Sequence, residues 1–356
     1  MLCIVMKRLC LSALLITMMG QASHAQTVAE GIDAAKEGRF ADALTIWKSE
    51  GSGEALRNIG GLYLAGVLGS TDLDLARTYF ENAAELGDAQ AMLSLGYMHL
   101  NGMGMPVDAP IAEDWFRKAG DLELAEARFM WARSVLDRKA DDTEIKAAII
   151  WLKDAAEAGV PKALTSVGDL LRTGTYTERN VNLAVDYYRR AGALGDNTAL
   201  KTIGDIYLFA ELGDPDISKA IEAYQAAADS GNTDAMYSLS YLFYMDPNSN
   251  SDTLTTAFEL AKTAAFSWHE QAQWLLGQMY LSGRGGNSDA EQAYFWLDLA
   301  ASAGVIEAHH LRALAFAQIG TDTAAKVHEK ARAWFDNNHK IPHSHRGLGG
   351  KQHVFK

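Results

Sequence analysis

Two glycine-rich loops contain the first residues in this sequence whose types and spacing could do chemistry. Gly283, Gly285 and Gly286 lie in "YLSGRGGNSD", and Gly102 and Gly104 lie in "NGMGMPVD". The backbone N–H groups of such a loop can hold a phosphate group when a Gly-Lys-Ser/Thr run follows. Neither loop is followed by that run. If the glycines recur at a fixed interval, they are better interpreted as turn residues of a repeat.

Other patterns for catalysis or metal binding are missing from the sequence. It has no Gly-x-Ser-x-Gly, no His-Glu-x-x-His and, after the first 25 residues, no Ser-x-x-Lys. Cys3 and Cys10 both lie in those first residues, so the remainder has no thiol nucleophile and no disulfide. His343 and His345 are two spaced imidazoles in a basic segment and make a weak metal site at best. We predict a protein that is not an enzyme and binds no cofactor and no metal.

The first 25 residues have the three parts of a secretory signal peptide. Lys7 and Arg8 precede an apolar run from Leu9 to Met19. The small residues Ser23 and Ala25 follow that run at the spacing of a cleavage site. The run is shorter than the roughly 20 residues that a membrane-spanning helix needs. We therefore expect cleavage after Ala25, a periplasmic or secreted protein, and no integral membrane segment in the mature chain.

The charge of the mature chain is acidic. Without Lys7 and Arg8, 30 basic residues remain against 45 acidic ones, so the formal charge changes from −13 to −15. Such a surface repels nucleic acid and anionic lipid. We therefore do not expect a nucleic-acid partner.

An alanine recurs along most of the chain at a fixed interval. The interval is 36 residues, with one exception of 37. Eight copies in one register indicate a repeat array rather than two ordinary globular domains. The marker alanines are Ala55, Ala91, Ala127, Ala163, Ala199, Ala235, Ala272 and Ala308.

Each period contains two helical patterns. In the first, apolar residues follow the marker alanine at i+4 and i+8, as in Ala199, Ile203 and Tyr207, and a small residue such as Gly204 stands at i+5. The second carries an aromatic residue among alanines and ends at a glycine. The small residue allows a neighbouring helix to approach closely, and the aromatic residue is expected to pack as a knob. The glycine loops at Gly102 and Gly283 then join the paired helices, so we interpret them as turns.

These residues resemble the Sel-one-like repeat, a relative of the tetratricopeptide repeat. The resemblance rests on Ala-x-x-x-Leu-Gly, a Gly-x-Gly loop and Ala-x-x-Trp/Tyr, and is clearest in the copies that start at Ala91 and Ala272. In the copies at Ala127 and Ala235, "DRKADD" and "MDPNSNSD" replace the glycine loop, so we expect different loops there. The resemblance implies an all-α fold, a right-handed α-solenoid of about eight helix-turn-helix repeats. We expect a signal peptide at 1–25, a half-repeat with Ala43 and Trp47 at 26–53, the solenoid at 54–335 and a flexible basic tail at 336–356.

Such solenoids bind proteins or peptides, so the resemblance implies an exported interaction scaffold of the bacterial cell envelope. A second hypothesis is a cell-wall or polysaccharide-binding protein, with or without weak hydrolase activity. A glycan binder should present aromatic platforms beside carboxylates in a groove, and a peptide binder should present a longer ridge of mixed residues.

Candidate binding residues come from positions that the repeat does not dictate. We count positions in the first helix with the marker alanine as the first. The seventh position carries polar residues in some copies and aromatic residues in others, which suggests an exposed ridge. Phe243 is expected to fill a core position, whereas its neighbour Tyr244 and the nearby Trp268 could be exposed hot spots. The candidates for partner binding are Tyr97, Arg133, Asp169, Asp205, Tyr241, Gln278, Tyr244 and Trp268.

Overall fold

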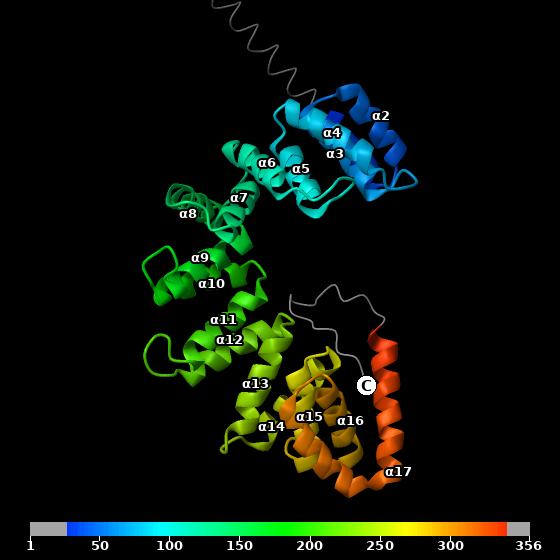
Figure 1. Cartoon of the computed structure of the whole chain (residues 1–356), viewed down its shortest axis with the longest axis vertical. Coiled ribbons are helices and arrows are strands. Elements are labelled where there is room, and N and C mark those ends of the chain that lie inside the picture. Colours follow the sequence, from blue (N-terminus) through cyan, green and yellow to red (C-terminus); the bar gives the residue numbers. More distant parts are fainter. Residues whose placement is uncertain (1–26, 340–356) are drawn as a thin grey trace, which may run out of the picture. The chain divides into compact units, whose positions relative to one another are not determined.

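The computed structural model describes residues 27–339, and all regular elements within them are helices (Figure 1). The chain divides into a first unit that ends at Val167 and a second that begins at Gly168, within α9. The first unit contains a helix over 27–36, α2 (Phe40–Glu50), α3 (Gly53–Ala65), α4 (Leu73–Glu85), α5 (Ala89–Asn101), α6 (Ala109–Asp121), α7 (Ala125–Asp137), α8 (Asp142–Glu157) and the start of α9 (Pro161–Thr173). The second contains the end of α9, then α10 (Val181–Ala193), α11 (Asn197–Leu208), α12 (Ile217–Asp229), α13 (Thr233–Met245), α14 (Ser251–Phe266), α15 (Glu270–Ser282), α16 (Ala290–Ser302) and α17 (Ile306–His339).

The expected repeat register is confirmed by burial. Each of the eight marker alanines is fully buried, and each begins the buried face of the first helix of a pair. Many helices start at an aspartate whose carboxylate accepts a hydrogen bond from the backbone N–H three residues later. Asp88 Oδ1, for example, accepts from the N–H of Ala91 at 2.7 Å. Such a cap stabilises a helix by about 1 kcal/mol, so the sequence marks both the start and the core face of these helices.

The small residue of the first helix lies against the aromatic residue of the second. A Cβ atom added to Gly96 would lie 2.4 Å from Phe116, and one added to Gly204 would lie 2.5 Å from Tyr224. Gly60 and Gly168 meet Phe80 and Tyr188 in the same way, and Gly277 meets the aliphatic Leu297 instead of an aromatic residue. Since no methyl group fits there, glycine sets the closest approach of the two helices in these repeats.

The two repeats with unusual loops have different geometry, as the sequence predicts. The loops before α8 and α14 cover only 138–141 and 246–250, and both of these helices have 16 residues instead of 13. In the second case Ser240 replaces the small glycine, and its hydroxyl donates to the carbonyl of Ala257 at 2.7 Å. A polar contact therefore replaces the glycine–aromatic contact in that pair.

The glycine loops are turns, which confirms that interpretation. Gly102 and Gly283 end α5 and α15 in the left-handed conformation, with φ of 66° and 69°. Gly104 and Gly285 approach the first turn of the second helix of the preceding repeat. Their added Cβ atoms would lie 2.6 Å from the Cβ atom of Leu73 and 2.5 Å from the carbonyl oxygen of Leu254. Packing therefore explains these glycines without a phosphate group.

The two ends of the described chain are more regular than the sequence suggested. Residues 27–36 and α2 form a helix pair in place of a half-repeat, and the buried Trp47 donates its indole N–H to the carbonyl of Val28 at 3.2 Å. At the other end, α17 continues to His339, beyond the expected end of the solenoid at 335. The signal peptide and residues 340–356, with His343 and His345, lie outside the described residues.

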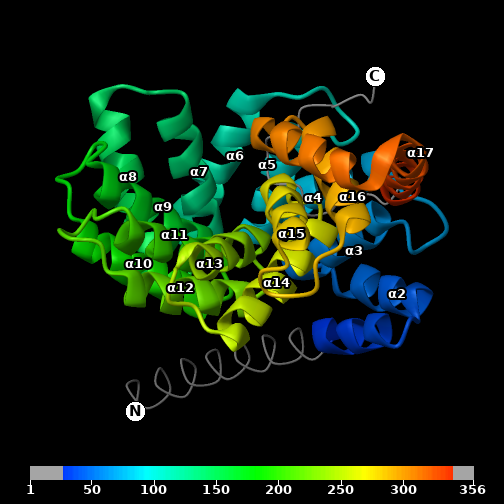
Figure 2. The same ribbon diagram turned by 90° about the horizontal axis from the view of Figure 1, so that it is seen from below.

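Helix α17 breaks at Gly320, where φ is 74° and ψ is 171° (Figures 1 and 2). Both parts of α17 contact the buried Asp298 of α16. Arg312 Nη1 lies 2.8 Å from its Oδ1 atom, and His328 Nδ1 lies 2.6 Å from its Oδ2 atom. A buried carboxylate is stable only when it is paired, so Asp298 holds the two parts of α17 together.

An aromatic cluster secures the part of α17 that follows Gly320. The ring of Trp334 stacks on Trp268 at 4.6 Å and meets the edges of Phe266, Phe295 and Trp296 at 5.7–6.2 Å. Trp268 takes a left-handed conformation with φ of 70°, at a helix end where neighbouring repeats use Gly231 and Gly304. That conformation costs a side chain about 1 kcal/mol, which the stacking offsets.

We predict that Gly96→Ala lowers the thermal midpoint of unfolding, because the new methyl group overlaps Phe116. The expected loss is about 1–3 kcal/mol. Gly61→Ala is the matched control, since nothing lies within 4 Å of its added Cβ atom, and it should raise stability slightly. Equal melting of the two variants would refute the close-approach explanation.

Trp334→Ala should release the part of α17 that follows Gly320, with a loss of about 2–4 kcal/mol, because Trp334 is the hub of the aromatic cluster. Hydrogen exchange of residues 321–339 measures this release directly. Phe316→Ala, on the same helix but 41% exposed, is the control. Unchanged protection in the Trp334 variant would show that the cluster does not hold the helix.

Candidate functional site

The first helices of three successive pairs in the second unit present an uninterrupted set of residues that the repeat does not bury. The set comes from the third and seventh positions, counted with the marker alanine as the first, which are one turn apart and therefore lie on one face. We call this set the ridge, and its members are Lys201 and Asp205 on α11, Tyr237 and Tyr241 on α13, and Trp274 and Gln278 on α15. The predicted Asp205, Tyr241 and Gln278 all belong to it.

The aromatic members of the ridge form one cluster across two helices. The ring centroid of Tyr241 lies 5.9 Å from that of Tyr237 and 6.3 Å from that of Trp274. Tyr237 also stacks on His269 at 4.8 Å, and Nε2 of that histidine lies 3.4 Å from Asp234. All three aromatic side chains of the ridge are partly exposed. A rigid and partly exposed aromatic cluster is typical of protein-binding hot spots.

Two polar atoms of the ridge are buried without a hydrogen-bond partner among residues 27–339. They are the indole Nε1 of Trp274, a donor, and Oε1 of Gln278, an acceptor one turn later on α15. Leaving such a group unpaired costs about 1–3 kcal/mol, and nearly all buried polar groups in proteins are paired. A bound partner can reach these buried atoms only if the side chains of Trp274 and Gln278 turn outward on binding.

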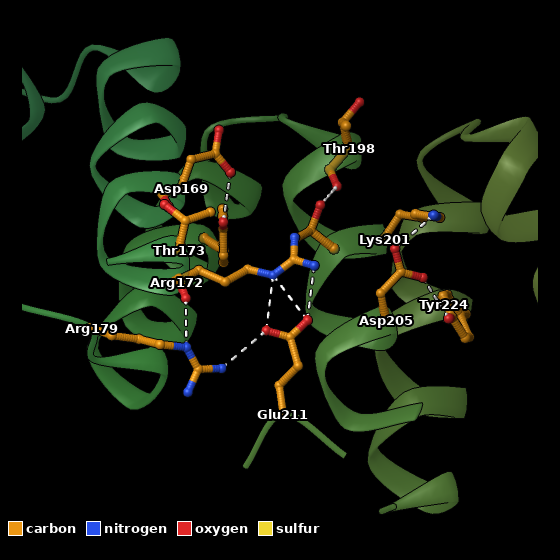
Figure 3. A network of polar contacts seen from close by, with 11 residues as sticks. Asp169, Arg172, Thr173, Arg179, Thr198, Lys201, Asp205, Glu211 and Tyr224 are labelled. Atoms are coloured by element: carbon orange, nitrogen blue, oxygen red, sulfur yellow. Dashed lines mark hydrogen bonds and ion pairs between the residues drawn. The ribbon is translucent and has the colours of Figure 1, made fainter. Parts of the chain in front are cut away.

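The acidic residues at the seventh position are engaged inside the fold (Figure 3). Asp169 accepts a hydrogen bond from the hydroxyl of Tyr188 at 2.7 Å, and Asp205 accepts from Tyr224 at the same distance, one repeat later. The second oxygen of Asp205 lies 2.7 Å from Lys201 Nζ. Burial and the hydrogen-bonded carboxylate raise the pKa of the Tyr224 hydroxyl well above its usual value. The Asp–Tyr pairs thus tie first helices to second helices.

A separate ion pair connects α9 with the loop after α11, as Figure 3 shows. Arg172 donates through Nε to both carboxylate oxygens of Glu211 at 3.0 and 3.1 Å. Nη2 of Arg179 lies 3.7 Å from Oε2 of the same glutamate. All three side chains are partly exposed, so the expected contribution to stability is at most about 1 kcal/mol. We interpret this contact as a structural tie between successive repeats.

Tyr97 and Arg133 belong to the first unit. The hydroxyl of Tyr97 donates to Glu126 at 3.1 Å, and its ring meets the edge of Phe116 at 5.5 Å. Burial, together with the charge of Glu126, raises the pKa of Tyr97 to about 12. Arg133 is exposed, with Asp137 3.6 Å away on the same helix. These two candidates have no aromatic cluster like that of the ridge around them.

Two other candidates lie elsewhere than predicted. Tyr244, proposed as exposed, is only 7% exposed, whereas Phe243, expected in the core, is partly exposed. The reason is that Tyr244 stands one turn after the buried Ser240 and therefore shares its inward face. Trp268 belongs to the cluster around Trp334 and is not on the ridge.

Tyr237 and Trp274 lie in the aromatic-rich stretches "MYSLSYLFYMD" and "FSWHEQAQW", which stand out in the sequence, but neither is among the candidates for partner binding chosen from it. Both stand at the third position of the first helix, one turn before the seventh position that carries the predicted Tyr241 and Gln278. A comparison of the third positions across repeats would have found them, because residues four apart on a helix share a face.

The fold and this arrangement define an all-helical repeat protein with an exposed first-helix surface. The Sel1 repeat model matches residues 53–88, 89–124, 138–160, 161–196, 203–232 and 270–305, and the chain belongs to the Sel1 repeat family. Proteins of this family are generally protein-interaction scaffolds. Of the repeats that depart from the pattern, the one at Ala127 is matched only from residue 138 and the one at Ala235 is not matched; the copy at Ala308 is not matched either.

Similar solved structures include one with the same fold. A Sel1 repeat protein from Oxalobacter formigenes is 23% identical, with a TM-score of 0.62, and the match covers 84% of this chain and 90% of that one. The protective antigen c5321 of uropathogenic Escherichia coli, which displays an SLR fold, is 18% identical over 93% of this chain and 90% of that one, with a TM-score of 0.41. The immunity protein Pa5087 of Pseudomonas aeruginosa is 20% identical over 72% and 82%, with a TM-score of 0.38. No curated protein sequence matches the chain.

We predict that Gln278→Met does not destabilise the free protein but raises its melting temperature by about 2 °C, because it removes an unpaired buried acceptor at similar volume. Gln225→Met is the control. That glutamine donates to Asp229 at 2.8 Å on an exposed helix face, so its replacement should give no gain. If Gln278→Met melts below the wild type, its amide is satisfied in the free protein.

Proposed function

We propose that this protein is an exported, non-catalytic scaffold of the bacterial cell envelope that binds a protein partner through the ridge. One observation carries the proposal. The ridge combines the partly exposed Tyr237, Tyr241 and Trp274 with two buried polar atoms that lack a partner. A protein segment would cover the aromatic rings, and the two buried atoms would pair with it only if their side chains turned outward on binding.

Membership of a family of interaction scaffolds supports the same function. The polar groups of the ridge also favour binding over catalysis. Both oxygens of Asp205 are occupied by Tyr224 and Lys201, so this carboxylate is not poised to accept a proton from a substrate.

Export is proposed from the sequence of residues 1–25, with its basic start, apolar run and small residues before the expected cleavage after Ala25. In the part of the chain that the structure describes, no helix has the length and apolarity needed to cross a membrane. Fractionation of cells that express the full chain tests this part. The proposal requires a processed protein, starting at Gln26, in the fraction released from the envelope.

The binding test is affinity capture of partners from the native envelope fraction, with the mature protein as bait. We expect a specific protein to be recovered with the wild type and lost with the double variant Tyr241→Ala, Trp274→Ala. Removal of two hot-spot aromatic residues should weaken binding at least 100-fold.

Tyr176→Ala is the matched control, because this tyrosine is 45% exposed in a loop of the same unit and away from the ridge. Its capture should equal that of the wild type. A partner that is retained by the double variant, while the variant melts like the wild type, would show that binding occurs elsewhere.

A further inference from the structure

The first unit contains a groove that the ridge and its function do not explain. It lies between α6 and α8, has a volume of about 510 Å³, and is lined by Trp131 and Trp151 together with Glu113, Asp114, Arg117 and Glu144. It belongs to the part of the repeat array where the glycine loop is replaced and where residues 125–137 match no family repeat. Of the lining residues, Trp131 alone lies in that unmatched stretch, and Trp151 stands at the Trp/Tyr position of the repeat pattern.

Two tryptophans form an apolar wall of the groove. The rings of Trp131 and Trp151 lie 4.6 Å apart with an interplanar angle of 59°. Trp131 is buried and Trp151 is partly exposed. Gly120 allows Trp151 to pack closely, since an added Cβ atom would lie 2.6 Å from the indole ring. This packing holds a flat aromatic surface in a fixed position.

The polar wall is made of carboxylates, and basic side chains pair with three of them. Arg138 lies 3.0 Å from Glu113 and 2.8 Å from Glu144 and so bridges the two. Asp114 lies 2.8 Å from Lys118 and 3.4 Å from Arg117. Each carboxylate has about four lone-pair sites, so acceptors remain after these contacts. The groove therefore offers acceptors and guanidinium donors, and Asp121 adds a further carboxylate to its lining.

We propose that this groove binds a neutral sugar ring of an oligosaccharide. The C–H face of a pyranose is flat and apolar and fits against Trp151, while its hydroxyl groups can donate to Glu144 and Asp114 and accept from Arg117. A small cation would compete with basic side chains that are already in place. An anion would face several carboxylates. This site is separate from the ridge and does not depend on the function proposed for it.

The test is isothermal titration of the purified mature protein with cellohexaose and with chitohexaose, accompanied by tryptophan fluorescence. We expect saturable binding of at least one of the two sugars, with a dissociation constant on the order of 0.01–1 mM, as suits a shallow site. Trp151→Ala should weaken that binding at least tenfold.

The matched control is Trp115→Ala, because Trp115 occupies the same repeat position 36 residues earlier and does not line the groove. It should bind sugar like the wild type. If Trp151→Ala proves unstable, Glu144→Gln serves as a second variant and should weaken binding about fivefold while its melting temperature stays close to that of the wild type.

Three results would overturn the proposal. The first is the absence of saturable binding of either sugar up to about 10 mM, well above the expected dissociation constant. The second is an equal loss of binding in Trp115→Ala and Trp151→Ala. The third is displacement of the bound sugar by spermidine at equal concentration, which would identify a site for cations instead.

Discussion

The contact between a glycine of the first helix and the aromatic knob of the second is the constraint on which the rest of the structure depends. At Gly96 and Gly204 an added Cβ atom would lie only 2.4–2.5 Å from the ring of the partner helix. Such close packing leaves each pair one preferred separation. The marker alanine on the same helix is fully buried in every copy, so the first, fifth and sixth positions are committed to the core.

Because these positions are used by the core, residues that bind a partner must stand at other positions of the repeat. In the second unit, positions three and seven of the first helix are at most partly buried and carry the ridge, whereas in the first unit Leu93 and Phe129 at position three are buried. Where the glycine–aromatic contact is replaced, the loops shorten and α8 and α14 lengthen to 16 residues. The first of these departures contains the groove with Trp151, and the second contains Tyr237 and Tyr241 of the ridge. Exceptions to the repeat thus coincide with the surfaces to which we assign binding.

The fold could be predicted from the sequence because helical periodicity and the 36-residue interval are local signals, and so could the turns at Gly102 and Gly283. Side-chain orientation could not be predicted where the repeat is irregular. Phe243 and Tyr244 exchanged their expected places because Ser240 bonds to the carbonyl of Ala257, a contact between two helices. The break at Gly320 and the stacking of Trp268 on Trp334 likewise depend on long-range packing.

For the candidate site, the seventh position of the first helix could be found from the sequence. The unpaired atoms of Trp274 and Gln278 became visible only in three dimensions.

The central claim is that the ridge is the surface that meets the partner, and photo-crosslinking from inside cells tests it most directly. A photoreactive phenylalanine analogue would replace Tyr241 on the ridge and, in a second protein, Leu183, which is 42% exposed on the second helix α10. The account predicts a discrete adduct with one other protein from position 241 and none from position 183. An adduct from position 183, with position 241 silent, would contradict it.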